Sequence, residues 1–186
     1  LDEVVAAAQA AAQSVGTMGV ALGPCTLPSV GKPGFTLGEG EIELGLGIHG
    51  EQGVQRMELQ PADALVRTMV ETIITDRKFA QGTRVAILVN GLGATPPIEL
   101  ALVSRAALAI AREHGLAVER LYTGVFLSAL DMPGASVSLI EVDDQTLSRL
   151  DAPTSAKGWT DDGYVAEKLT IIPALAILRA GLEGAM

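Results

Sequence analysis

Hydrophobic positions along the chain follow the helical period in some segments and the strand period in others. Leu65, Met69 and Ile73 share one face of residues 61–80, which predicts a helix that begins at a proline. Residues 1–14 are rich in alanine and open with acidic side chains, which favours a second helix. Apolar or alternating runs predict strands at residues 17–23, 41–47 and 83–90, the last with both faces covered.

The following segments predict a helix, two more strands and a short helix. Residues 91–100 form a glycine loop that enters a helix running to about His114, with Thr95 as expected N-cap. Residues 117–130 are expected to form one long strand, which turns at "MPG" and returns as residues 135–142 in an antiparallel hairpin. Asp143 is expected to start a short helix ending at Leu150.

Together these elements predict an α/β fold with two layers: a mixed β-sheet of about five to six strands with helices packed mainly on one face. Residues 1–151 are interpreted as one domain. Residues 152–186 form a C-terminal extension that we expect to be partly helical, with a helix at 163–181. The extension leads toward a further domain or packs on this one, and the sequence leaves both open.

Composition narrows the classes of function. The chain has 186 residues, of which 48% are hydrophobic and only 3% aromatic, so one core of small aliphatic side chains is expected. A net charge of −9 argues against binding to nucleic acid or to an anionic membrane surface. The single cysteine, Cys25, excludes an intrachain disulfide, fits a cytoplasmic location and is interpreted as a small buried group rather than a nucleophile. No Cys/His cluster has zinc spacing, so no bound metal is expected.

The segment "EIELGLGIHGEQG" carries the candidate chemistry. Gly45, Gly47 and Gly50 match the dinucleotide pattern G-x-G-x-x-G, but no helix is expected before Pro61, so nucleotide binding is not favoured. The glycines leave space around His49, whose neutral imidazole could add to a small ketone while Glu51 orients the ring. A structural histidine remains the alternative. The other histidine, His114, is interpreted as a favourable charge at a helix end.

Three long stretches are similar to one family. Residues 19–53, 88–100 and 128–153 ("GVALGPCTLPSVGKPGFTLGEGEIELGLGIHGEQG", "LVNGLGATPPIEL" and "SALDMPGASVSLIEVDDQTLSRLDAP") resemble the second domain of the substrate-binding subunit of dihydroxyacetone kinases. The resemblance implies that His49 bonds covalently to the carbonyl carbon of dihydroxyacetone as a hemiaminal, with Gly47 and Gly50 beside the substrate. It also implies a cytoplasmic homodimer or other homo-oligomer that acts in glycerol metabolism.

The resemblance places the remaining machinery elsewhere. No cofactor is expected on this domain, since ATP or ADP and magnesium belong to a partner nucleotide-binding domain or subunit, and no Walker loop occurs here. The family's first domain, which supplies the catalytic base, has no counterpart in this sequence. We therefore expect the chain to be a fragment that lacks the N-terminal half of the subunit and is inactive by itself.

Other candidate residues have structural interpretations. Asp131 is expected to stabilise the "MPG" turn, and Asp143 and Asp144 to cap the next helix. The loop "GLGATPP" is either a turn or an anion site at a helix start. Two alternatives to a kinase component stay open: a regulatory paralogue that senses the triose without phosphorylating it, and a structural remnant in which His49 has no chemical role.

Overall fold

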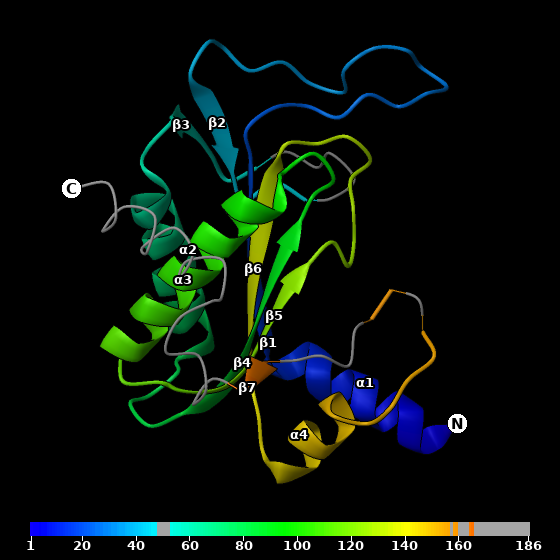
Figure 1. Ribbon diagram of the computed structural model, residues 1–186, viewed down its shortest axis with the longest axis vertical. Coiled ribbons are helices and arrows are strands. Elements are labelled where there is room, and N and C mark those ends of the chain that lie inside the picture. The colour runs from blue at the N-terminus through cyan, green and yellow to red at the C-terminus, as the bar shows by residue number, and fades with distance from the viewer. Residues whose placement is uncertain (48–52, 157, 160–163, 166–186) are drawn as a thin grey trace, which may run out of the picture.

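The computed structural model describes residues 1–47, 53–156, 158–159 and 164–165 (Figure 1). Four helices and seven strands lie within these residues. In chain order they are α1 (Asp2–Ser14), β1 (Val15–Ala21), β2 (Glu41–Leu44), β3 (Gln55–Glu58), α2 (Ala62–Arg77), β4 (Arg84–Gly91), α3 (Pro97–Glu113), β5 (Ala117–Gly124), β6 (Gly134–Glu141), α4 (Asp144–Leu150) and β7 (Tyr164–Val165).

The described strands form one sheet in the order β3-β2-β1-β6-β4-β5-β7. Only β4 and β5 are parallel, and the other neighbours are antiparallel. The predicted α/β fold with a mixed sheet is therefore confirmed. The sheet contains one strand more than the five to six expected, since β7 adds two residues beside β5.

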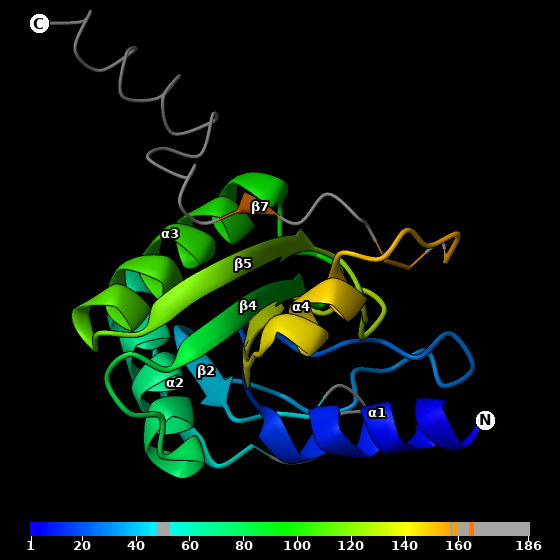
Figure 2. The ribbon, with the colours of Figure 1, turned by 90° about the horizontal axis from the view of Figure 1, so that it is seen from below.

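Helices α2 and α3 cover one face of the sheet, whereas α1 and α4 lie on the other side near one end (Figures 1 and 2). Alternation within the strands explains the covered face: Val85, Ile87 and Val89 of β4 are fully buried against the core. The predicted helical face of α2 is buried against them, through Leu65, Met69 and Ile73. Packing mainly on one face is thus confirmed.

The predicted hairpin of residues 117–142 is wrong. β5 ends at Gly124, and β6 pairs with β1 on one side and β4 on the other. An apolar strand such as β6 can bury its backbone groups fully only between two neighbours, and the central position provides both. The polar side chain of Asn90 also binds the backbone of Phe126 and Leu127, which ends β5 early.

Three local features differ from what the sequence predicted. The N-cap of α3 is Pro96 rather than Thr95, whose hydroxyl binds the backbone of Gly134 instead. β3 was not predicted, because its side chains are mostly exposed and show no apolar alternation. The covering of β4 on both faces is confirmed only in part, since Ala86 packs under α4 but Leu88 borders a cleft.

The start of the C-terminal extension packs on this domain. The ring of Trp159 lies 4.9 Å from that of Tyr122 and 5.5 Å from that of Phe126, measured between centroids. Shortly afterwards, β7 pairs with the edge of β5. The helix expected at 163–181 falls almost wholly outside the described residues. No helix in the part of the chain that the structure describes is long and apolar enough to cross a bilayer.

Candidate functional site

The candidate site lies where the β2–β3 hairpin meets β1. Strands β2 and β3 pair from Glu41 with Glu58 to Leu44 with Gln55. Beyond the last pair, the amide of Gly45 donates to the carbonyl of Gly19 at 2.7 Å. Gly45 has a positive φ of 76°, and a Cβ there would lie 2.6 Å from a methyl carbon of Val54, so this position requires glycine.

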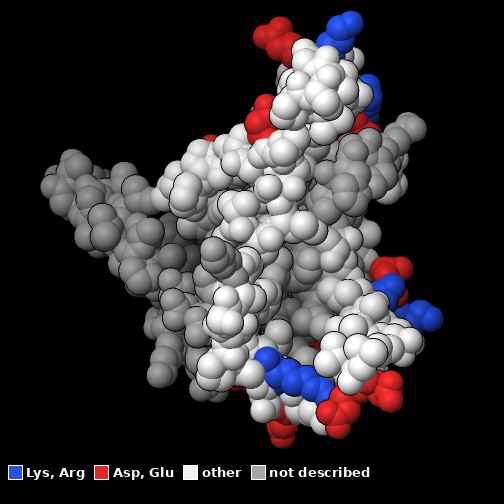
Figure 3. Space-filling model, turned by 90° about the vertical axis from the view of Figure 1, so that its right-hand side faces the viewer, with Lys and Arg blue, Asp and Glu red and all other residues white. Residues whose placement is uncertain are grey.

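A cleft of about 580 Å³ opens beside these glycines. Gly45, Leu46 and Gly47 line one side of it, and Gly19 of β1 lines another. Among the described residues that line it, Asp76 is the one that carries a charge. On the side of the molecule that carries α1 and the β1–β2 loop, the charged side chains of the described residues gather toward the upper and lower ends (Figure 3). The described walls of the cleft thus offer one negative charge and otherwise apolar and neutral polar groups.

The sheet contributes hydroxyl and amide groups to the cleft. Because side chains alternate along β6, Val137 faces the helices while Ser136 and Ser138 point to the cleft. The hydroxyls of Ser138 and Thr17 are hydrogen-bonded at 2.8 Å. Such groups can donate to and accept from the hydroxyls of a small sugar.

Asn90 fixes another wall of the cleft. Its side-chain oxygen accepts hydrogen bonds from the amides of Phe126 (2.8 Å) and Leu127 (3.0 Å). Its side-chain nitrogen donates to the carbonyl of Leu127 at 2.9 Å and approaches the hydroxyl of Ser136 at 3.4 Å. Asn90 is only 3% exposed, so these bonds satisfy a polar group that would otherwise be buried without partners.

Two of the residues singled out from the sequence reach this cleft, and three cannot be placed. Gly45 and Gly47 line it. His49, Gly50 and Glu51 lie outside the described residues, so the covalent role of His49 stays a prediction. Sequence analysis missed the polar wall formed by Asn90, Ser136 and Ser138. Its signals were an asparagine ending an apolar strand and serines alternating with apolar residues.

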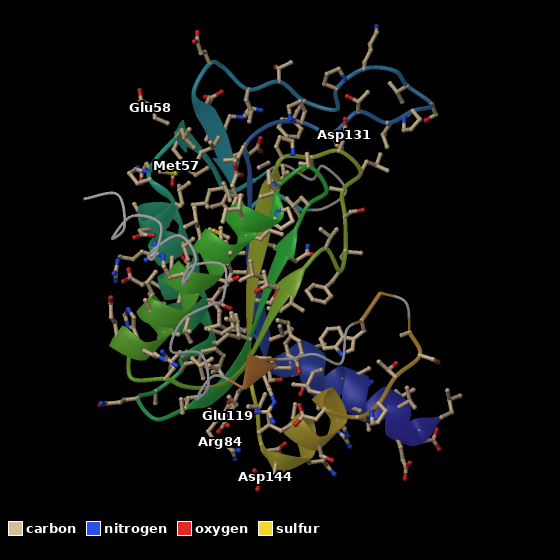
Figure 4. All side chains as sticks on the ribbon, in the orientation of Figure 1. Met57, Glu58, Arg84, Glu119, Asp131 and Asp144 are labelled. Atoms are coloured by element: carbon tan, nitrogen blue, oxygen red, sulfur yellow. The ribbon has the colours of Figure 1, made fainter. Side chains whose placement is uncertain are left out.

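The aspartates have structural roles. Asp131 accepts a hydrogen bond from the amide of Thr26 at 2.9 Å, so it joins two loops at one end of the sheet (Figure 4), and its expected role in its own turn stays a prediction. Asp143 caps α4 by accepting from the amide of Thr146 at 2.7 Å, and this bond lowers the pKa of Asp143. Asp144 does not cap the helix but pairs with Arg84 at 2.8 Å.

Arg84 binds Glu119 as well as Asp144, far from the cleft at the other end of the sheet (Figure 4). His114 ends α3 as expected, and its Nε2 lies 3.2 Å from a carboxylate oxygen of Glu71. This hydrogen bond is the main reason why the pKa of Glu71 is lowered.

The two remaining candidates have structural explanations. The start of α3 is a poor anion site, because Pro96 and Pro97 have no amide hydrogen and Glu99 places a negative charge in the first turn. Cys25 is half-buried and packs against an apolar cluster of Ala21, Leu46 and Leu92, in line with the structural interpretation.

Comparison with known proteins identifies the family. The model of the Dak1 domain matches residues 1–158, so the chain belongs to the Dak1 domain family. It is 46% identical over 164 residues to a Solanum lycopersicum protein named "Putative 3,4-dihydroxy-2-butanone kinase", covering 86% of this chain and 27% of that protein.

Two further relatives are a subunit and a solved structure. The chain is 38% identical over 160 residues to the dihydroxyacetone-binding subunit DhaK of PTS-dependent dihydroxyacetone kinase 1 from Listeria innocua, covering 86% of this chain and 49% of that subunit. Among solved structures, it resembles the dihydroxyacetone kinase operon co-activator DhaQ with a TM-score of 0.79 and 30% identity, covering 86% of this chain and 50% of that one. The chain thus spans half or less of the length of these relatives.

Proposed function

We propose that this chain is part of a dihydroxyacetone kinase and captures dihydroxyacetone, or a similar short keto-sugar, as a covalent hemiaminal on His49. The observation that carries the proposal is the place of the described residues that flank His49: Gly47 follows β2 and lines the cleft, and Gly53 precedes β3 of the same hairpin. The relationship to a dihydroxyacetone-binding subunit supports the choice of ligand.

The proposed step is an addition that needs no other reactant. A lone pair of the neutral imidazole of His49 forms a bond to the carbonyl carbon, and the electrons of the C=O π bond move to the oxygen. That oxygen gains a proton, while the imidazole loses its own N–H proton, so the adduct contains every atom of the sugar. A triose offers few contacts, and a reversible covalent bond supplies affinity that contacts alone cannot.

The covalent bond also explains selectivity. Glycerol has the same number of carbons but no carbonyl, so it cannot form the adduct. Once tethered, a hydroxyl of the sugar can be presented to a phosphoryl donor in a fixed orientation. In this proposal the donor, ATP or a phosphocarrier with magnesium, is held by a separate domain or subunit. The N-terminal half of the subunit supplies the base, and the assembly is a homo-oligomer in the cytoplasm.

One specific observation favours a second candidate function. The similarity to DhaQ, a co-activator, means that a chain of this fold can serve in regulation. A regulatory paralogue would form the same adduct but would not support phosphoryl transfer. The two candidates therefore share the first chemical step and differ in the second.

The adduct is tested by native mass spectrometry of the chain with dihydroxyacetone, with glycerol as the control ligand. We expect a mass increase of one triose with the ketone and none with glycerol. The chain offers a matched control, since it contains two histidines. His49→Ala should abolish the increase, whereas His114→Ala should leave it intact. An adduct that survives His49→Ala would refute the proposed role of His49.

A second measurement separates the kinase from the regulator. The chain is supplied with the N-terminal half and the nucleotide-binding subunit of a related kinase, and transfer of phosphate from ATP to dihydroxyacetone is followed. A kinase component should give turnover that depends on His49. An adduct without turnover under these conditions would favour the regulatory function.

A further inference from the structure

Glu43 is the one carboxylate side chain that is buried among the residues that the structure describes, with 2% of its surface exposed. Burying a carboxylate costs roughly several kcal/mol unless other groups replace the hydrogen bonds that it made to water. Its neighbours in β2, Ile42 and Leu44, belong to the apolar core, so the charge is placed among residues that gain stability from burial. Its burial therefore depends on the groups that contact the carboxylate.

The described partners of Glu43, Gly53 and Arg56, lie on the returning side of the hairpin. One carboxylate oxygen accepts a hydrogen bond from the amide of Gly53 at 2.6 Å. The other lies 3.5 Å from Nε of Arg56, the residue paired with Glu43 across the two strands. Glu43 therefore joins the outgoing strand to the first described residue that follows the segment containing His49.

The contact between Gly53 and the Glu43 carboxylate requires a residue without a side chain at position 53. A Cβ on Gly53 would lie 2.6 Å from Cγ of Glu43 and 2.6 Å from the carbonyl oxygen of Leu44. Both distances are too short for any side chain, so the backbone of Gly53 can approach Glu43 only because it is glycine. On the opposite side of the turn, Gly45 is held by the carbonyl of Gly19. Gly45 and Gly53, which flank the segment that contains His49, are thus held by separate hydrogen bonds.

We infer that Glu43 is a positioning residue for His49: its charge-assisted hydrogen bond to Gly53 fixes the end of the segment that carries the imidazole. Such bonds are stronger than those between neutral groups, and small misplacements of a reacting group are costly. This inference rests on the proposed function, since it assigns Glu43 a role in the addition to the ketone.

The chain contains a matched control for Glu43. Glu41 lies two residues earlier on the same strand, and its carboxylate also accepts a hydrogen bond from a glycine amide, that of Gly38, at 2.9 Å. Gly38 precedes β2, however, whereas the segment that contains His49 follows β2. Equivalent substitutions at Glu41 and Glu43 therefore remove the same type of hydrogen bond before β2 and after β2, respectively.

The experiment measures the dihydroxyacetone concentration that half-saturates the adduct, using Glu43→Leu and Glu43→Gln with Glu41→Leu and Glu41→Gln as controls. Glu43→Leu removes the acceptor for Gly53 and should raise that concentration by about tenfold to a hundredfold. Glu43→Gln keeps an amide oxygen as acceptor and should recover most of the loss. Both Glu41 variants should match the unchanged protein.

A second readout does not depend on the ketone. Diethyl pyrocarbonate modifies histidines, and the rate at His49 divided by that at His114 reports the surroundings of His49 within one sample. Glu43→Leu should change this ratio, and Glu41→Leu should not. If the unchanged protein forms no adduct, the proposed function fails, while the ratio still tests whether Glu43 controls the imidazole.

The inference is overturned if Glu43→Leu keeps both the adduct and the ratio, or if Glu43→Gln is as defective as Glu43→Leu. Circular dichroism checks that each variant is folded. If Glu43→Leu does not fold, Gly53→Ala tests the same contact from the other side. It should impair the adduct as strongly, and an adduct unaffected by Gly53→Ala would also overturn the inference.

Discussion

The hydroxyl of Thr95 forms two hydrogen bonds with the backbone of Gly134, donating to its carbonyl oxygen at 2.6 Å and accepting from its amide at 2.8 Å. Thr95 follows β4 and Gly134 begins β6, so the pair extends the contact between these strands beyond their ladder. A Cβ on Gly134 would lie 2.2 Å from the carbonyl of Val20, which shows how tightly the three segments meet. Thr95, which the sequence suggested as a helix cap, thus holds the first residue of the central strand β6.

Replacing Thr95 by valine tests this role. Valine has nearly the same shape but no hydroxyl, so the amide and carbonyl of Gly134 lose their partner in a half-buried place. We expect the free energy of unfolding to fall by about 1–3 kcal/mol, measured by urea denaturation. Thr95→Ser keeps the hydroxyl and should cost much less. Equal stability of the valine variant and the unchanged protein would refute the role.

The Asn90 side chain is expected to matter more, because it holds three backbone groups of one loop. Asn90→Leu should leave these groups buried without partners and lower the free energy of unfolding by about 2–4 kcal/mol. Phe126 contacts Trp159, so the fluorescence of this single tryptophan should also change. Ser136→Ala removes only a long 3.4 Å contact and serves as the control. A leucine variant as mild as this control would contradict the prediction.

The fold class could be predicted from the sequence because the spacing of hydrophobic residues distinguishes helices from strands. Leu65, Met69 and Ile73 reveal the buried face of α2 whatever it packs against. Strand order could not be obtained in this way. The sequence shows β5 and β6 separated by a turn, but whether they pair depends on what else can satisfy β6, and β1 and β4 are far away in the chain.

Only the part of the candidate site that lies within one continuous stretch of sequence could be proposed from the sequence. The glycines around His49 stand together in the sequence, so the space that they leave around the imidazole could be proposed. Glu43, by contrast, alternates with apolar residues like any polar side chain of a half-exposed strand. Its burial arises because Gly53 returns to cover it. The pattern of one strand cannot predict the burial of a side chain when the residues that cover it come from a later segment of the chain.

The pKa of Tyr122 offers a test of the packing of the extension. Its hydroxyl is buried without a hydrogen-bond partner in the described part of the chain, and burial raises its pKa. Trp159 lies against this ring. Trp159→Ala should admit water and lower the pKa of Tyr122 toward its ordinary value of about 10. The measurement is an ultraviolet titration in a Tyr164→Phe background, because the chain has two tyrosines. An unchanged pKa would mean that Trp159 does not cover Tyr122.

The ion pair between Asp151 and Arg120 predicts how stability depends on pH. Its hydrogen bonds are 2.6 Å and 2.9 Å long, and they lower the pKa of Asp151 in the folded state. A lowered pKa stabilises the fold above the unfolded value, and this contribution disappears as the pH falls through the folded value.

Asp151→Asn should therefore be less stable than the unchanged protein at neutral pH. The difference in free energy of unfolding should shrink below about pH 4, where the aspartate of the unfolded chain becomes protonated. Asp144→Asn is the control, because Asp144 is 93% exposed and its pair with Arg84 should contribute little at any pH. Urea denaturation at several pH values measures both. A constant difference for Asp151→Asn down to acidic pH would show that the carboxylate charge is not what stabilises this end of the domain.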